Sequence, residues 1–235
     1  MATVIERSQE LDLGRAKREP LALRPGRRYF ADHPLTVEEF YALIGEGSHA
    51  ELVDGAILVP SPTSYEHEDL CTWLVSICRS YAEERRLGSV VGGHTSVRLD
   101  EYNTRIPDIL FVAKRRRAII KRLDVQGPPD WVVEIVASDS GRREAVAKQP
   151  QYERLGVPEI WRIDIVRHKL TIIRRTSTGE YQTCFQGASG EFAPDALPGL
   201  ELKVKWFRMT EDRRPSVHRV VSRLLEKAAR ELDDD

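Results

Sequence analysis

The sequence predicts an α/β fold of the α+β type, in which helices flank a mixed β-sheet. The expected elements follow the order helix, hairpin, helix, strands, helix and strands, which is typical of helices packed on a mixed sheet. The 235 residues are 41% hydrophobic, enough to bury a substantial core. We find no internal repeat, and this composition excludes a disordered or fibrous chain.

The first part of the chain contains an arm, a short helix and a hairpin. Residues 1–30 mix charges with proline and glycine and show no sustained hydrophobic period, so we expect a flexible or extended N-terminal arm. Thr36 and Glu39 have the spacing of a capping box, which predicts a helix to about Glu46. Two apolar runs then flank Asp54-Gly55, a dipeptide that favours the tight turn of a β-hairpin.

A longer helix and several strands follow. Ser64 is a candidate N-cap, and apolar residues recur after it at helical spacing until Gly88. Short apolar runs after this helix predict strands at Ser89–Val91, Ser96–Leu99, Ile109–Val112 and Trp131–Val136. The last run is apolar throughout except for Glu134, so we expect a central strand covered on both faces.

The remaining elements complete the sheet and add a tail. Ser140 is a candidate N-cap for a second long helix, which Gly156 would end. Further strands are expected at Ile160–Ile165, Leu170–Arg174 and Tyr181–Phe185, and a final helix at Val217–Leu232. The predicted organisation is an arm at residues 1–30, a domain at 31–207 and a C-terminal helical tail at 208–235.

The charges nearly cancel but are segregated along the chain. The 36 basic and 37 acidic residues give a net charge of -1, which removes the simplest argument for nucleic-acid binding. Residues 29–78 hold nine acidic residues and no Lys or Arg, whereas residues 105–175 hold 16 basic and nine acidic residues. An acidic centre inside a basic rim would suit metal-dependent phosphodiester chemistry, and ordinary solvated surface explains the pattern equally well. The run Lys114–Arg117 is likewise either a phosphate contact or a solvated turn.

The cysteines and the N-terminal residues favour a reducing cytoplasm. Cys71, Cys78 and Cys184 are odd in number and form no CxxC pair, so we expect no disulfide framework and no zinc site. The first ten residues carry charges where a signal peptide would be apolar, and no apolar stretch approaches the roughly 18 residues needed to span a bilayer. The expected location is therefore cytoplasmic.

Two carboxylates could meet at one end of the sheet. Asp108 follows Pro107 at the start of one apolar strand, and Glu134 lies inside another. If the strands are neighbours, two hard oxygen ligands would suit Mg²⁺. The alternatives are a loop-opening Asp and a strand Glu paired with Arg. An ionised Glu between apolar residues is nevertheless costly to bury without a cation or several hydrogen-bond donors.

A lysine could reach these acids from the following helix. Lys148 lies 14 residues after Glu134, so a helix packed back across the strand end can bring its ammonium group to the carboxylates. The same lysine could instead pair with Glu144 at i,i+4 spacing, and the spacing alone does not decide between them. Tyr152, one turn further on, is expected to be a core residue.

Five motifs occur in a characteristic order along residues 33–207. They are ELVDG at Glu51–Gly55, Ser61-Pro62 with His67, Pro107-Asp108, WVVEIV at Trp131–Val136, and K-x-P-x-Y-x-x-x-G-V-P-E-x-W at Lys148–Trp161. As a set they resemble the Uma-type putative restriction endonuclease family of the PD-(D/E)XK nuclease superfamily. The resemblance implies a restriction-endonuclease-like αβββαβ core in residues 31–207, with Mg²⁺ or Mn²⁺ as the cofactor.

The resemblance also implies a role for each of five residues. Asp108 and Glu134 match the metal-binding acids of the family. Lys148 matches a catalytic lysine that the family carries on the helix after the third strand. Glu51 matches a recurrent acid, a further metal ligand or a water-orienting carboxylate, and His67 matches a recurrent polar residue near the pocket.

The sequence departs from the family pattern at one loop, and the resemblance implies one function beside which an alternative stays open. The family usually shows Ser-Pro-Ser where this chain has Ala137-Ser138-Asp139, so we expect a differently shaped loop on the substrate side. The resemblance implies a Mg²⁺-dependent endonuclease that hydrolyses phosphodiester bonds, in DNA, as a homodimer by analogy with the superfamily. The alternative is a nucleic-acid-binding or assembly module that uses the basic stretch without cleavage.

Overall fold

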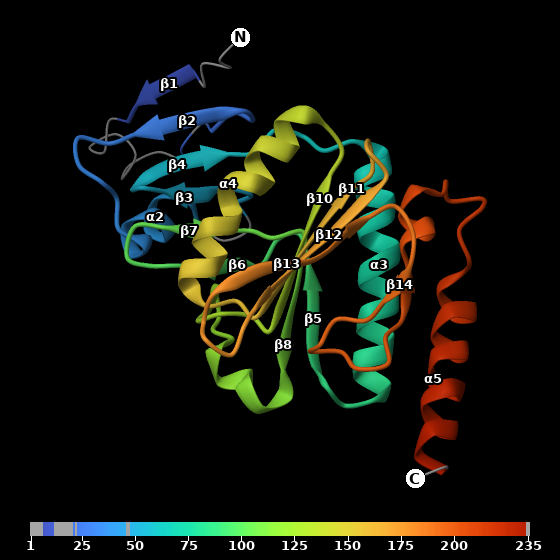
Figure 1. Ribbon diagram of the computed structural model, residues 1–235. Coiled ribbons are helices and arrows are strands. Elements are labelled where there is room, and N and C mark those ends of the chain that lie inside the picture. The colour runs from blue at the N-terminus through green and yellow to red at the C-terminus, as the bar shows by residue number, and fades with distance from the viewer. Residues whose placement is uncertain (1–6, 12–20, 22, 46–47, 234–235) are drawn as a thin grey trace. The chain divides into compact units, whose positions relative to one another are not determined.

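The computed structural model describes residues 7–11, 21, 23–45 and 48–233, and these form two compact units (Figure 1). The first unit comprises Met1–Pro62, His94–Ile106 and Lys121–Gly127, and the second comprises Thr63–Gly93, Pro107–Ile120 and Pro128–Asp235. Each unit has its own sheet. Within the described residues, no helix has both the length and the apolar character that crossing a bilayer requires.

The first unit is built on a seven-stranded mixed sheet. In spatial order its strands are β1 (Arg7–Glu10), β2 (Arg27–Phe30), β4 (Ala56–Val59), β3 (Glu51–Val53), β7 (Thr104–Arg105), β6 (Ser96–Arg98) and β9 (Asp124–Gln126). Helix α2 (Val37–Ile44) begins with the predicted capping box, in which Thr36 Oγ1 accepts from Glu39 N and the Glu39 carboxylate accepts from Thr36 N. Buried apolar side chains of α2, β3 and β4 share one core cluster, so the helix and the sheet stabilise each other.

The hairpin of β3 and β4 has the predicted turn. Asp54 and Gly55 both have positive φ, 51° and 74°, as a type I′ turn requires. Gly55 is required for a second reason, because a Cβ there would lie 2.5 Å from Pro34 Cβ. The turn therefore fixes the register of the two strands.

Part of the predicted arm belongs to this sheet. Arg27–Phe30 pair with β4 in antiparallel fashion, and the Tyr29 side chain is buried. These residues are extended within a sheet and not free, because Tyr29 supplies apolar surface to the core of the first unit. Residues 1–6, 12–20 and 22 of the arm lie outside the described residues. The division of the chain at residues 30 and 207 stays a prediction.

The second unit is built on a six-stranded mixed sheet. In spatial order its strands are β13 (Tyr181–Gly187), β12 (Lys169–Arg175), β11 (Glu159–Asp164), β10 (Trp131–Val136), β8 (Ile109–Ala113) and β5 (Gly88–Gly92). Only β10 and β11 pair in parallel. The short strands β14 (Glu191–Phe192) and β15 (Leu202–Lys203) form a separate pair. The mixed sheet agrees with the predicted fold class.

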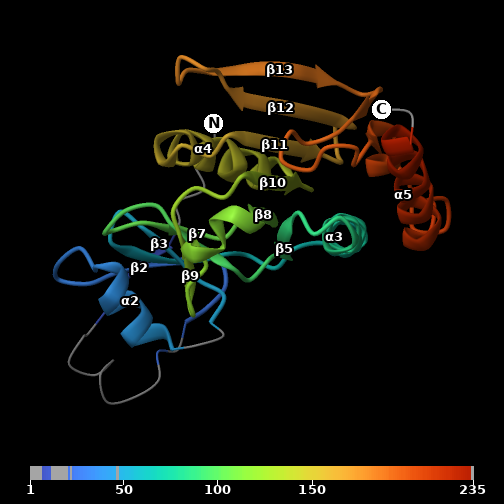
Figure 2. The same ribbon diagram turned by 90° about the horizontal axis from the view of Figure 1, so that it is seen from below.

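Helices cover both faces of this sheet. Figure 1 shows the strands between α4 (Asp139–Leu155) and α3 (Tyr65–Glu84), with α5 (Val217–Asp233) beyond α3, and Figure 2 shows the strand order from below. The core cluster joins α3, α5 and alternate residues of β10. In chain order α3, β5, β8, β10, α4 and β11 reproduce the predicted αβββαβ core.

Two helix boundaries differ from those predicted. Helix α4 begins after Ser138, whose Oγ accepts from Gly141 N at 3.0 Å, so Ser138 and not Ser140 is the N-cap. Helix α3 ends at Glu84 with Arg85 as its C-cap, and Gly88 already belongs to β5. The other signals agree: Ser64 caps α3, and Gly156 ends α4 in the left-handed conformation.

The run Lys114–Arg117 lies in a 3₁₀ helix, η1 (Lys114–Ile119), that follows β8. Within it, Arg116 lies 3.1 Å and Arg115 3.8 Å from Asp130 Oδ1. Two of the four cations of the run are therefore paired with an acid of the same unit. A second 3₁₀ helix, η2 (Val204–Arg208), precedes α5 and buries Trp206 and Phe207.

Candidate active site

Two neighbouring strands of the second unit position the candidate acids. β8 and β10 are antiparallel, with Ile109 opposite Val133. One step further in this register, Asp108 stands beside Glu134, and Asp108 Oδ2 accepts a hydrogen bond from Ile135 N at 2.6 Å. The strands that carry the two acids are therefore neighbours, which is the condition under which both carboxylates could serve one metal site.

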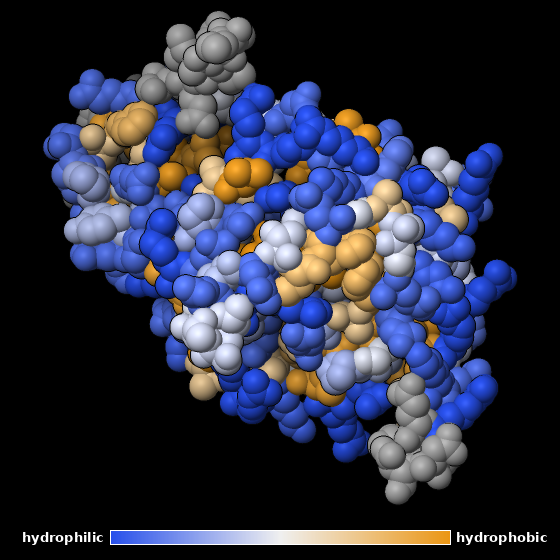
Figure 3. Space-filling view, in the orientation of Figure 1, coloured by the Kyte–Doolittle hydropathy of each residue, from blue (hydrophilic) through white to orange (hydrophobic). Residues whose placement is uncertain are grey.

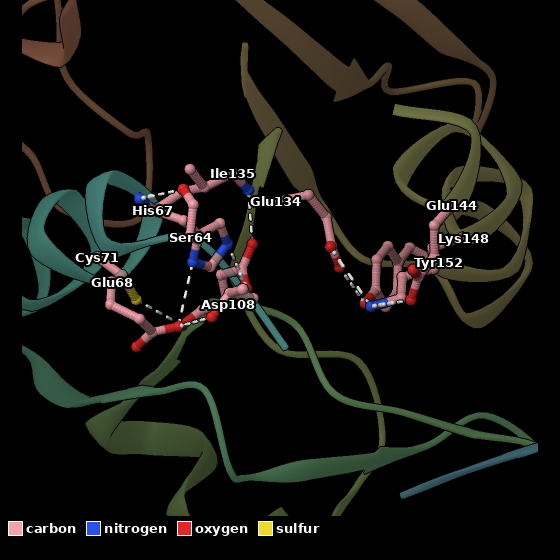
Figure 4. Close-up of polar contacts among 11 residues, drawn as sticks. Ser64, His67, Glu68, Cys71, Asp108, Glu134, Ile135, Glu144, Lys148 and Tyr152 are labelled. Carbon is pink, nitrogen blue, oxygen red and sulfur yellow. Dashed lines mark hydrogen bonds and ion pairs between the residues drawn. The ribbon is translucent and has the colours of Figure 1, made fainter. Parts of the chain in front are cut away.

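Glu134 points away from the apolar core and towards α4. Its neighbours Val133 and Ile135 belong to the core cluster on the α3 side, so alternation along the strand turns Glu134 to the other face. There its carboxylate accepts from the Tyr152 hydroxyl at 2.7 Å and lies 3.4 Å from Lys148 Nζ (Figure 4). The Glu134 side chain is only 8% exposed, and these contacts offset the cost of burying its charge.

Helix α4 presents three polar side chains on one of its faces. Glu144, Lys148 and Tyr152 are spaced by four residues and therefore lie on the same helical face. Lys148 is buried, and its Nζ lies 3.7 Å from Glu144 Oε1 as well as 3.4 Å from Glu134 Oε2. Lys148 thus contacts both of its predicted partners, Glu134 on β10 and Glu144 on α4. The Glu134 side chain is buried, whereas the Glu144 side chain is 42% exposed.

Tyr152 combines two roles that the sequence reasoning had separated. It is fully buried, as a core residue should be. It also donates to Glu134, so it belongs to the candidate site. Its spacing of four residues from Lys148 was the available signal, because a lysine and a tyrosine one turn apart reach the same neighbouring strand.

His67 contacts Asp108 from the first turn of α3. Its Nε2 lies 3.2 Å from Asp108 Oδ1, and its Nδ1 lies 3.2 Å from Glu68 Oε1. Burial of the ring would lower the pKa of His67, but the adjacent Asp108 and Glu68 carboxylates outweigh burial, and the pKa is raised. Ser64, the N-cap of α3, accepts from His67 N and fixes the backbone at this position.

The Asp108 backbone is held as firmly as its side chain. The Asp108 carbonyl accepts from Gly93 N at 2.9 Å, and the Cys71 thiol lies 3.5 Å from the same oxygen. Burial raises the pKa of Cys71 to about 12, which favours the protonated thiol. The Cys71 side chain belongs to the core cluster of the second unit.

Glu51 belongs to the first unit and lies on β3. It is fully buried, and its carboxylate accepts from the Arg105 guanidinium and from Ile106 N, each at 2.8 Å. The predicted role of Glu51 as a further metal ligand or water-orienting acid stays a prediction.

The donor set of the second unit fits a hard divalent cation. Among the described residues, no group of three or more His, Cys, Asp and Glu side chains could hold a metal ion. Mg²⁺ needs fewer protein ligands, because it commonly binds one or two carboxylates and keeps several waters. Asp108 and Glu134 supply such carboxylates from adjacent strands, and the Asp108 side chain is 21% exposed and so open to a hydrated ion. The Glu134 carboxylate is oriented towards Lys148 and Tyr152, and that of Asp108 towards His67 (Figure 4).

Sequence reasoning missed an arginine on the strand next to Glu134. Arg162 on β11 is the register partner of Glu134, and its guanidinium donates to Gln149 Oε1 at 3.0 Å. Burial lowers the pKa of Arg162. The parallel pairing of β10 with β11 places it there, and that pairing leaves no mark in the local sequence.

Comparison with known proteins agrees with this architecture. A family model described as putative restriction endonuclease, Uma2, matches residues 37–205. A crystal structure of a putative nuclease belonging to DUF820 from Anabaena variabilis is similar with a TM-score of 0.62 and 20% identity, over 74% of this chain and 98% of that one. At that identity the likeness shows the fold alone. The search of curated proteins gives no match. Because the family model covers most of the chain, the protein belongs to the Uma2 family of putative restriction endonucleases.

Proposed function

We propose that the protein is a Mg²⁺-dependent endonuclease that hydrolyses phosphodiester bonds in DNA. The observation that carries the proposal is the buried pair of Glu134 on β10 and Lys148 on α4, 3.4 Å apart. The amide of Ile135, the next residue of β10, donates to Asp108. Two acids and a lysine at one end of a sheet are the groups that phosphodiester hydrolysis needs. Family membership supports the same reaction class.

Each residue of this site has its own role in the proposed reaction. Asp108 and Glu134 would hold Mg²⁺ or Mn²⁺, which when bound polarises the scissile phosphate and acidifies a water. The Lys148 ammonium group lies beside Glu134, where it can donate to a phosphate oxygen and offset developing negative charge. Tyr152 donates to Glu134 and thereby fixes the carboxylate next to the lysine.

His67 is a positioning residue in this scheme. It contacts Asp108 and not the α4 side chains, so it acts through the orientation of that carboxylate. The contact of 3.2 Å between His67 Nε2 and Asp108 Oδ1 holds this carboxylate in place. A fixed carboxylate loses less entropy when it binds a cation or positions a water.

Plasmid cleavage tests the proposal. Supercoiled DNA incubated with the protein in Mg²⁺ or Mn²⁺ is expected to become nicked and linear, and EDTA is expected to stop the reaction. A Glu134→Gln protein purified in parallel controls for contaminating nucleases, and a single-stranded RNA substrate shows whether DNA is preferred. Cleavage that persists in EDTA would contradict the metal requirement. Binding without cleavage in every divalent ion would instead favour the non-cleaving module.

A further inference from the structure

A basic groove lies between α5, η2 and the loop that joins them in the second unit. Its volume is about 480 Å³. The charged residues that line it are six basic and one acidic: Lys203, Lys205, Arg213, Arg214, Arg219, Arg223 and Asp212. Mostly hydrophilic residues extend along the exposed side of α5 (Figure 3). The groove therefore collects positive charge in a chain whose net charge is -1.

Some of this charge is compensated inside the unit. Lys203 and Arg223 both pair with Glu191, at 3.5 and 3.3 Å. Arg214 is buried and pairs with Asp69 on α3 at 2.9 Å. These three cations hold the groove together and are not the ones that a ligand would neutralise.

Three cations remain available. Lys205, Arg213 and Arg219 are exposed. None of them makes an ion pair within the described part of the chain. Asp212 is the acid that lines the groove beside them. The exposed cations exceed this carboxylate by two charges, so the groove attracts anions.

The floor of the groove is rigid. The Trp206 ring is 7% exposed, and Lys203 and Arg223 lie over it at 6.0 and 5.8 Å from its centroid. Trp206 packs edge-on against Trp73 of α3, with centroids 6.0 Å apart, and the Trp73 indole donates to the Pro215 carbonyl at 2.8 Å. A buried indole cannot stack on a base, so the groove offers charge and no aromatic platform.

The wall that carries Arg213 is also fixed. The amides of Arg213 and Arg214 both donate to the Thr210 carbonyl at 3.0 Å, and the Arg214 guanidinium donates to the Met209 carbonyl at 2.7 Å. Because Arg214 also pairs with Asp69, the loop is fastened to the first turns of α3. Exposed cations on a fixed loop bind an anion with little ordering cost.

We propose that this groove binds the phosphodiester backbone of a nucleic acid and forms a second, non-catalytic contact of the substrate. This rests on the proposed function, because it assigns the ligand from the phosphodiester chemistry of the same unit. Helix α3 carries His67 at the candidate active site and Trp73, which packs against Trp206 beneath the groove. The groove and the candidate active site therefore belong to the same unit.

The contact is independent of base sequence. Lys and Arg side chains in a groove without an exposed ring bind phosphates, which position a nucleic acid but carry no sequence information. The loop and α5 lie after residue 205, where the family match ends. The groove is thus a feature of this chain that the family description does not assign.

Salt-dependent binding tests the inference. A fluorescent duplex of about 20 base pairs is titrated with protein in EDTA, so that no cleavage occurs, at several NaCl concentrations. The Lys205→Ala/Arg213→Ala/Arg219→Ala variant is expected to bind at least about tenfold more weakly at low salt. It should also lose about two to three units from the slope of log K against log salt, at about 0.9 per phosphate contact.

Two further variants control for charge alone. Arg79→Ala/Arg167→Ala/Arg175→Ala removes three exposed cations elsewhere in the same unit and is expected to retain most of the parent affinity and slope. Asp212→Asn removes the acid of the groove and is expected to tighten binding. Equal weakening by the two triple variants, or an unchanged slope in the groove variant, would overturn the inference, as would a parent protein that does not bind the duplex.

The outcome is separable from that of the proposed function. Because the groove contains no part of the acid and lysine set, the Lys205→Ala/Arg213→Ala/Arg219→Ala substitutions should weaken DNA binding by the same factor in an Asp108→Asn background as in the parent. If the parent binds through the groove but never cleaves, only the nuclease proposal fails. If it cleaves while binding is indifferent to the groove variant, only the groove fails.

Discussion

Replacing Asp108 with asparagine is expected to lower the rate of plasmid cleavage by about a thousandfold, with little change in fold. The amide oxygen can still accept from Ile135 N, so the link between β8 and β10 persists. The negative charge is lost, however, and with it one of the two hard ligands for the cation. Removal of a single preorganised electrostatic group commonly costs about 10² to 10³ in rate, and the loss of a metal ligand lies at the upper end.

Initial rates of nicking at fixed Mg²⁺ measure this effect. The matched control is Glu83→Gln, which neutralises an exposed carboxylate on α3 that pairs only with Arg79. The control should cleave at the parent rate, and both variants should unfold at a similar temperature. An Asp108→Asn protein that keeps more than a tenth of the parent rate would remove Asp108 from the reaction.

Replacing Lys148 with methionine is expected to affect both activity and stability. Methionine has nearly the same length, so packing is retained, but Glu134 is left buried without its cation. Breaking a buried pair on one side costs about 3–5 kcal/mol, because the remaining charge is uncompensated. The Tyr152 hydroxyl still donates to Glu134 and keeps the expected loss near the lower bound, about 3 kcal/mol. Cleavage should fall by about a hundredfold or more, since phosphate charge is no longer offset.

Urea unfolding of single and double variants measures the stability effect. Adding Glu134→Gln to Lys148→Met should restore much of the free energy of unfolding, because no buried charge remains, and should not restore cleavage. The matched control is Glu144→Gln, which removes the half-exposed partner of Lys148 and should cost only a few tenths of a kcal/mol. If Glu144→Gln costs as much as Lys148→Met, the helical pair and not the strand pair would be the important one.

Local signals in the sequence predicted most of the elements around the site. The capping box at Thr36, the turn at Asp54-Gly55 and the left-handed Gly156 depend on a few adjacent residues, and the structure has all three. Only Ser140 was predicted as the N-cap of α4, and Ser138 carries the same side chain two residues earlier. The geometry of the chain after β10 decides between them, and the sequence does not show it.

The strand pairing could not be predicted in the same way. The short strands β7 and β9 complete a sheet with β3 and the predicted strand β6 through contacts between distant residues, and neither was predicted from a local pattern. Glu51 shows the difference at a single residue, because its partner Arg105 lies 54 positions away. The local sequence predicted neither the burial of that carboxylate nor the identity of its donor.

The sequence pointed to the residues of the candidate site, but not to most of the contacts between them. The approach of Lys148 to Glu134 was one of two alternatives that the spacing left open, and the structure shows it together with the contact to Glu144. The amide of Ile135 that binds Asp108 is a backbone group, which no residue pattern reveals. Positive charge was expected between residues 105 and 175, yet the basic groove lies further on, where distant segments converge on α3.

The central claim is that Asp108 and Glu134 together bind one divalent cation. The most direct measurement is a crystal structure of the protein soaked in Mn²⁺, with the ion located by its anomalous signal. We expect one peak in the second unit with carboxylate oxygens of both Asp108 and Glu134 at about 2.1 Å, and with Lys148 Nζ nearby. A fully soaked crystal with no peak there, or with a peak bound to only one of the two acids, would contradict the claim.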